Sequence, residues 1–147
     1  METLLDFLTK LYQSSKRYRE RLDCPLSAFQ QLYVCQACRS PGSSQDAIAR
    51  RLCVSKSSAA RHLAALEQSG YVTRATDPED RRILRVTPTE KALAIFPQEE
   101  ALMEEWEQRL LEDFTPEERT ALAALLERAA RKAAALTGGE SGVKKKG

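Results

Sequence analysis

The chain has 147 residues, 42% of them hydrophobic, and a formal net charge of +2. A chain of this length can form one domain that buries a core without disulfides or metal. Its longest apolar run is far shorter than the ~20 residues of a membrane span, and its first residues lack the apolar core of a signal peptide. We therefore expect a cytoplasmic protein with no membrane partner.

The first two predicted helices lie between residues 1 and 42. Apolar residues recur at three- and four-residue steps from Leu4 to Leu22, which is typical of an amphipathic helix of roughly twenty residues. Pro25 disfavours continuation of that helix. Ser27 can cap a second helix, which we expect to end near the Ser40-Pro41-Gly42 turn.

Two short helices and a hairpin are predicted next. Ser43 or Ser44 can cap a third helix, and Ser55 can cap a fourth that runs to about Ser69. Two β-prone runs follow, residues 71–74 and 83–86, joined by a turn-forming Asp-Pro-Glu-Asp segment. This order predicts a mainly α fold with a small β-hairpin wing, that is, a winged helix-turn-helix.

The remaining chain is predicted to be helical. The sequence Thr87-Pro88-Thr89-Glu90 indicates a capping box with Pro88 at the first helical position, and Pro97 predicts a kink or a break in that helix. Thr115 starts the last helix, which should stop near Gly138. We expect four regions: an N-terminal dimerisation helix (1–24), a DNA-binding region (25–91), C-terminal dimerisation helices (92–138) and a disordered tail (139–147).

The DNA-binding interpretation depends on the order of elements and on charge. A helix that starts at Ser55 can enter a major groove while a basic hairpin enters the adjacent minor groove. Residues 39–91 contain ten basic and six acidic residues, whereas residues 92–147 contain eight basic and eleven acidic ones. The excess of positive charge therefore lies where phosphate contacts would be made.

The segment SQDAIARRLCVSKSSAARHLAALEQSGYVTRATDPEDRRILRVTPTEKA resembles the MarR family of winged helix-turn-helix regulators. The resemblance lies in Val54-Ser55, Leu66-Glu67, Gly70-Tyr71, Asp80-Arg81-Arg82 and the run from Val86 to Lys91. It implies a homodimer joined by the first and last two helices, with Arg82 in the minor groove and Asp80 orienting the wing. It also implies a transcriptional repressor that is released from a palindromic operator by small, often phenolic, effectors or by oxidation.

We predict a set of DNA-contacting side chains on the fourth helix, at its entrance and on the wing. Arg61 can donate two hydrogen bonds to a guanine edge, and short hydroxyls can reach phosphates or bases. The predicted residues are Ser44, Ser55, Lys56, Ser57, Ser58, Arg61, His62, Arg74, Asp80, Arg81 and Arg82.

Four cysteines, Cys24, Cys35, Cys38 and Cys53, suggest a second hypothesis. The spacing of Cys35 and Cys38 suits metal ligation or thiol exchange, and thiolate-rich sites favour zinc or an iron–sulfur cluster. Cys24 is too distant along the chain to join them easily, but Cys53 could converge on the pair. Cys53 also lies in the turn before the fourth helix, where a positive φ would favour glycine. An ordinary role in the core stays open for each of them.

The signal that the protein senses stays open between a cysteine site, a small aromatic ligand and none. Phe96, Met103 and Trp106 could line a pocket for such a ligand, although residues at this spacing are also typical of a core. Two other functions compete with DNA binding: a thiol oxidoreductase using Cys35 and Cys38, and a winged-helix adaptor that binds proteins. Because no catalytic constellation stands out, we expect a DNA-binding regulator and not an enzyme.

Overall fold

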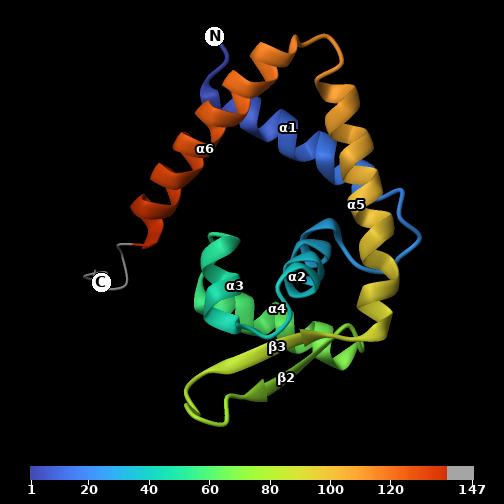
Figure 1. Cartoon of the computed structure of the whole chain (residues 1–147), viewed down its shortest axis with the longest axis vertical. Coiled ribbons are helices and arrows are strands. Elements are labelled where there is room, and N and C mark those ends of the chain that lie inside the picture. Colours follow the sequence, from blue (N-terminus) through green and yellow to red (C-terminus); the bar gives the residue numbers. More distant parts are fainter. Residues whose placement is uncertain (139–147) are drawn as a thin grey trace.

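The computed structural model describes residues 1–138 and confirms a mainly helical fold with a small antiparallel sheet (Figure 1). The predicted disordered tail, residues 139–147, lies outside the described residues. The elements in chain order are α1 (Leu4–Arg19), α2 (Ala28–Arg39), β1 (Ser43–Ser44), α3 (Gln45–Arg51), α4 (Lys56–Gln68), β2 (Val72–Thr76), β3 (Leu84–Pro88), α5 (Glu90–Leu110) and α6 (Pro116–Gly138).

The elements from α2 to β3 form one body, which we call the head. Its core contains Tyr33, Ile48, Leu63, Leu66 and other buried side chains from α2, α3, α4 and the sheet. The helices begin where hydroxyl side chains cap them: Ser27 accepts from the backbone N–H of Gln30 at 3.1 Å, as the sequence predicts. The head therefore packs around a single apolar centre.

The sheet of the head has the strand order β1-β3-β2. In the hairpin that we call the wing, Val72 pairs with Pro88 and Thr76 with Leu84. β1 was not predicted, because its two serines resemble a loop in sequence. It pairs antiparallel with β3, with Ser43 opposite Val86, and so ties the start of α3 to the wing.

The helices α1, α5 and α6 form an arm: α5 leads away from the sheet of the head, and α6 turns back toward the side on which α3 lies (Figure 1). The predicted start of α5 is wrong by two residues: Pro88 remains in β3, and Thr89 caps the helix by accepting from the N–H of Ala92. α5 continues through Pro97 without a break. No helix within residues 1–138 has the length and apolar character needed to cross a membrane.

A buried polar contact joins the arm to the head. Glu99 of α5, which is only 2% exposed, accepts a hydrogen bond from Arg19 Nε of α1 at 2.9 Å. Its other oxygen accepts from the thiol of Cys35 in α2 at 3.0 Å. Because one carboxylate is shared by side chains of two other helices, we expect it to set the angle between arm and head.

Candidate nucleic-acid interface

The exposed face of α4 carries several of the predicted DNA contacts. Ser55 caps the helix, and its side chain accepts from the N–H of Ser58 at 3.0 Å. Lys56 and Ser57 are exposed, although the ammonium of Lys56 lies 3.4 Å from Asp46. Arg61 is exposed and has no hydrogen-bond or ion-pair partner within residues 1–138. The guanidinium of Arg61 is therefore available to a ligand that approaches α4.

The prediction that His62 lies on this outer face is wrong. Its ring stacks on Tyr33 of α2, with centroids 5.1 Å apart and an interplanar angle of 25°, and meets Phe29 edge-on at 5.1 Å. Ser58, one turn earlier, is half-buried on the same side of α4. An imidazole is large and partly apolar, so packing against two aromatic rings competes well with exposure. His62 holds α4 against α2.

Arg74 also differs from its predicted role. Its Nε and Nη2 donate to Glu67 of α4 at 3.3 and 3.2 Å, and its Nη1 donates to Gln45 of α3 at 3.0 Å. Its backbone N–H donates to the second oxygen of Glu67 at 2.8 Å. Since the guanidinium is already satisfied inside the head, we correct Arg74 from a DNA contact to a brace between α3, α4 and β2.

The tip of the wing is ordered by two arginine–aspartate pairs. Arg82 Nε and Nη2 donate to the two oxygens of Asp80, each at 3.0 Å, and this pairing lowers the pKa of Asp80. Asp77 accepts from the N–H of Glu79 and from Arg85 Nε at 3.0 Å, contacts that lower the pKa of Asp77. The Arg82 side chain is nonetheless 90% exposed, so Asp80 orients a cation that faces solvent.

A cleft with arginine side chains on both sides lies between α3 and the wing. Ser44, a predicted contact, caps α3 by accepting from the N–H of Ala47 at 3.1 Å, and it lines a cavity of about 520 Å³ together with Arg81 and Arg82. Arg50 of α3 lines the same cavity. We did not predict Arg50 from the sequence. The signal was present in the adjacent pair Arg50-Arg51, of which only Arg50 faces the cavity.

Known regulators resemble this chain in sequence and in fold. Residues 26–84 match the model of the MarR family. The protein YybA of Bacillus subtilis (strain 168), an HTH-type transcriptional regulator by name, is 31% identical over 106 residues, which are 72% of this chain and 71% of YybA. The chain belongs to the MarR family. Its relatives are transcriptional regulators, which confirms a DNA-binding regulator and not an enzyme.

Solved MarR-family structures agree with this fold over most of the chain. A crystal structure of MarR is 31% identical with a TM-score of 0.77 and covers 93% of this chain and 95% of its own. A structure of the regulator SlyA is 25% identical with a TM-score of 0.79, covering 90% and 97%. A variant of MarR from E. coli, crystallised with operator DNA, is 25% identical with a TM-score of 0.73, covering 86% and 92%.

The four cysteines of this MarR-family chain do not gather at one site. Within residues 1–138 no group of three or more His, Cys, Asp or Glu side chains could hold a metal ion. Cys35 is buried, and its burial and its hydrogen bond to Glu99 strongly raise the pKa of its thiol. Cys38 is half-buried against the core, and Cys24 accepts from the N–H of Leu26. Within residues 1–138, Cys35, Cys38 and Cys53 therefore do not form the single site that the sequence left open. The buried thiol of Cys35 does not suit an oxidoreductase.

Cys53 has the positive φ that the sequence suggested for the turn before α4. It is exposed in the turn before α4, and its φ is 53°, the only positive φ of a non-glycine residue within residues 1–138. The left-handed region costs an L-residue on the order of 1 kcal/mol. The turn thus accepts a strained backbone at a thiol that solvent can reach.

Proposed function

We propose that this chain is a homodimeric repressor that binds a palindromic operator, with α4 in the major groove and the wing in the adjacent minor groove. The observation that carries the proposal is the unpaired, exposed guanidinium of Arg61 on α4 beside a wing whose Arg82 is oriented by Asp80. A guanidinium can donate two hydrogen bonds to a guanine edge. The operator complex of E. coli MarR supports DNA as the ligand, and the MarR resemblance supports repression.

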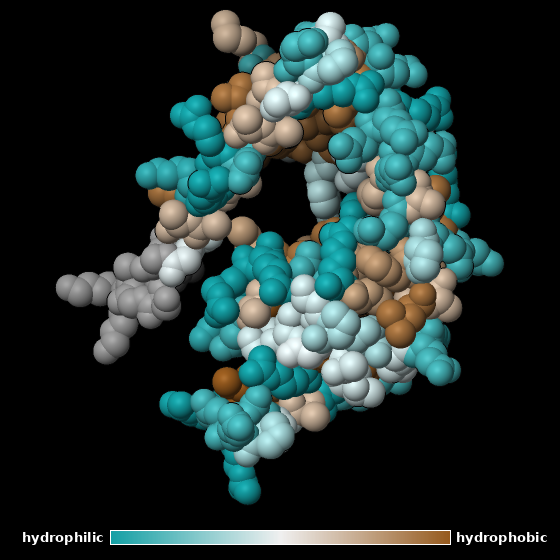
Figure 2. Space-filling view, viewed as in Figure 1, coloured by the Kyte–Doolittle hydropathy of each residue, from teal (hydrophilic) through white to brown (hydrophobic). Residues whose placement is uncertain are grey.

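Dimerisation is supported by the arm. α6 has 23 residues and no buried side chain. Its large apolar side chains Leu125, Leu126 and Leu136 are exposed. Figure 2 shows hydrophobic side chains gathered on the inner side of the arm. A helix of this kind contributes little to a monomer, because helical stability comes mostly from burying an apolar face.

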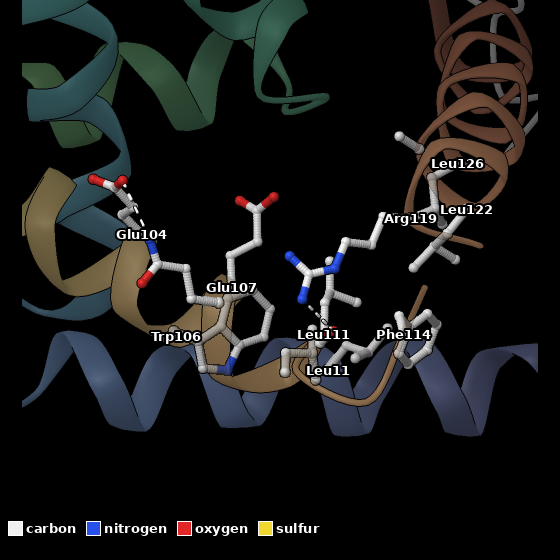
Figure 3. Close-up of a pocket in the computed structure, with 12 residues that line it drawn as sticks. Leu11, Glu104, Trp106, Glu107, Leu111, Phe114, Arg119, Leu122 and Leu126 are labelled. Carbon is white, nitrogen blue, oxygen red and sulfur yellow. Dashed lines mark hydrogen bonds between the residues drawn. The ribbon is translucent and has the colours of Figure 1, made fainter. Parts of the chain in front are cut away.

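An apolar groove of about 660 Å³ lies between α1, α5 and α6. In Figure 3, Leu122 and Leu126 of α6 face Trp106, Leu111 and Phe114 across the groove. Arg119 closes part of it by donating to the carbonyl of Leu111 at 2.7 Å. We propose that the arm of a second copy fills this groove, so that two heads are held at a fixed separation on DNA.

The DNA proposal is tested on duplexes selected by the protein from a random library. Fluorescence anisotropy should give tight, salt-dependent binding. Arg61→Ala should weaken it by at least about 30-fold, because both half-sites of the dimer lose the contact, and should relax the preference at one base pair per half-site. Arg128→Ala is the matched control, because it removes the same charge from an exposed site on α6. Equal binding by both variants would contradict the reading role of α4.

The dimer proposal is tested by sedimentation. Leu126→Asp should shift the protein from dimer to monomer, because the charge would enter the apolar groove. Ala124→Asp places the same charge on the face of α6 that carries Arg128, and it should stay dimeric. A monomeric wild-type protein at micromolar concentration would refute the proposal.

We also propose that a small aromatic anion controls DNA binding. A cleft of about 280 Å³ between α1, α2 and α5 is lined by Arg19, Arg39, Met103 and Trp106. Phe96, predicted for such a pocket, does not line it; the Arg39 guanidinium lies 5.9 Å from its ring centroid. Glu107 also lines the cleft, and Arg19 and Arg39 are paired with Glu99 and Glu100. The indole of Trp106 therefore supplies the main surface for an aromatic ring, and a carboxylate on the ligand would compete with Glu100 for the half-exposed Arg39. The buried thiol of Cys35 makes a cysteine signal the weaker hypothesis.

Trp106 reports on this cleft directly, because it is the only tryptophan of the chain. Benzoate, as a simple aromatic carboxylate, should change its fluorescence in a saturable way and lower the affinity for the selected duplex. Arg39→Gln should weaken the effect, whereas the exposed Arg128→Gln should not. No saturable change up to millimolar benzoate would count against an aromatic anion.

A further inference from the structure

The cleft between α3 and the wing presents two arginines from opposite walls. Its cavity of about 520 Å³ is bounded on the α3 side by Ser44 and Arg50 and on the wing side by Thr76 and Arg81. Both arginines are exposed. The structure therefore has a second basic surface, distinct from the outer face of α4.

These two arginines, like Arg61 on α4, differ from the other arginines of the head in having no partner for their guanidinium within residues 1–138. Most other basic side chains of the head are engaged: Arg51 donates to Ser43 Oγ, and the partners of Lys56, Arg74, Arg82 and Arg85 are acidic side chains. Arg50 and Arg81 have no hydrogen-bond or ion-pair partner for their side chains in the described part of the chain. The acidic residue of the cleft, Asp46, is itself paired with Lys56. The cleft thus has an uncompensated positive charge, which its walls concentrate.

We propose that this cleft binds the sugar–phosphate backbone of the DNA strand that separates the two grooves read by the head. The inference rests on the proposed docking of α4 and the wing. If α4 occupies a major groove and the wing the neighbouring minor groove, the strand between those grooves must cross the surface between them. The cleft adjoins that surface, because its Asp46 pairs with Lys56 at the start of α4 at 3.4 Å. Arg50 and Arg81 would then hold phosphates from its two sides. Such contacts fix register and orientation without reading bases.

The salt dependence of binding gives the first test. Each phosphate contact contributes about 0.9 to the slope of log K against log salt concentration. Because a dimer has two clefts, Arg50→Ala should lower that slope by about two, which makes binding roughly 60-fold weaker at 0.1 M KCl if the two affinities are equal at 1 M. The loss should be the same on the selected duplex and on a scrambled one. Arg81→Ala should behave alike, whereas Arg128→Ala should change neither quantity.

A conservative variant separates charge from fold. Arg50→Lys keeps the charge and should keep most of the slope, since a phosphate accepts an ammonium nearly as well as a guanidinium. If Arg50→Ala and Arg81→Ala leave the slope unchanged, or if Arg50→Lys loses as much as Arg50→Ala, the phosphate contact is wrong. Circular dichroism of each variant verifies that the helices are intact.

Methylphosphonates, which remove the charge of a single phosphate, show which phosphates the cleft contacts. Methylphosphonate substitutions scanned along one half-site of the selected duplex should weaken wild-type binding at one or two positions between the grooves. Arg50→Ala should lose this sensitivity at the position that Arg50 contacts, and Arg81→Ala at the position that Arg81 contacts. Arg61→Ala keeps this test independent of the proposed function. If Arg61→Ala destroys the base preference while Arg50→Ala remains sensitive to methylphosphonates at every position, only the phosphate contact in the cleft is refuted. If neither variant changes DNA binding, the proposed docking of α4 and the wing is wrong.

Discussion

Replacing Glu99 by alanine should destabilise the protein by about 3–5 kcal/mol. Glu99 lies 2.9 Å from Arg19, and the two side chains are 2% and 14% exposed. At an effective dielectric constant of about 20, unit charges at this distance attract by about 6 kcal/mol, and loss of hydration offsets most of that energy. Alanine removes the attraction but leaves Arg19 poorly hydrated. It also leaves the Cys35 thiol without its acceptor.

The measurement is urea unfolding at fixed protein concentration, because dimers gain apparent stability with concentration. Glu105→Ala is the matched control on the same helix: its ion pair with Arg21 spans 3.9 Å between half-exposed groups, so it should cost less than about 1 kcal/mol. The double variant Arg19→Met/Glu99→Leu removes both charges and should recover most of the stability. If Glu99→Ala costs no more than Glu105→Ala, the reasoning about this junction is refuted.

Three further results are expected. Cys53→Gly should stabilise the protein by up to about 1 kcal/mol in urea unfolding, because its φ of 53° favours glycine; a loss of stability would contradict the strain. Iodoacetamide at pH 8 should label the exposed Cys53 quickly, and Cys35, whose pKa is strongly raised by burial, only after denaturation; early labelling of Cys35 would show that its burial is incomplete. The lowered pKa of Asp80 means that its pairing with Arg82 is complete above the ordinary value of 3.8 and is lost as the pH falls through the lowered pKa. Wing amide resonances should therefore be constant from pH 7 to 5 and shift only in stronger acid, and a transition near pH 6 would point to another group.

Local signals in the sequence predicted most of the fold. Ser27, Ser55 and Thr115 begin helices because a hydroxyl at the cap satisfies free backbone N–H groups. In the structure each of these hydroxyls accepts a hydrogen bond from the backbone N–H three residues later. The positive φ at Gly70 follows from its place after α4. Errors were confined to features that need a distant partner. β1 exists only because β3 lies beside it, and Pro88 stays in a strand for the same reason.

The candidate site was harder to predict than the fold. The sequence places Arg61 and His62 side by side, but their directions around α4 differ by about 100°, and only the packing of Tyr33 and Phe29 decides which one is covered. Arg74 looks like any exposed strand arginine until Glu67 and Gln45 are seen around it. The availability of a cation for DNA thus depends on which acidic side chains fold against it. Chain order alone does not give that information.

The central claim is that two heads of one dimer read DNA with α4 and the wing. Hydroxyl-radical footprinting on the selected duplex tests it most directly. We predict two protected half-sites related by a dyad, with centres about 10 base pairs or a multiple of that distance apart, because the recognition helices of a two-fold dimer enter successive major grooves. A single asymmetric footprint, or the same footprint with Arg61→Ala at unchanged affinity, would contradict the claim.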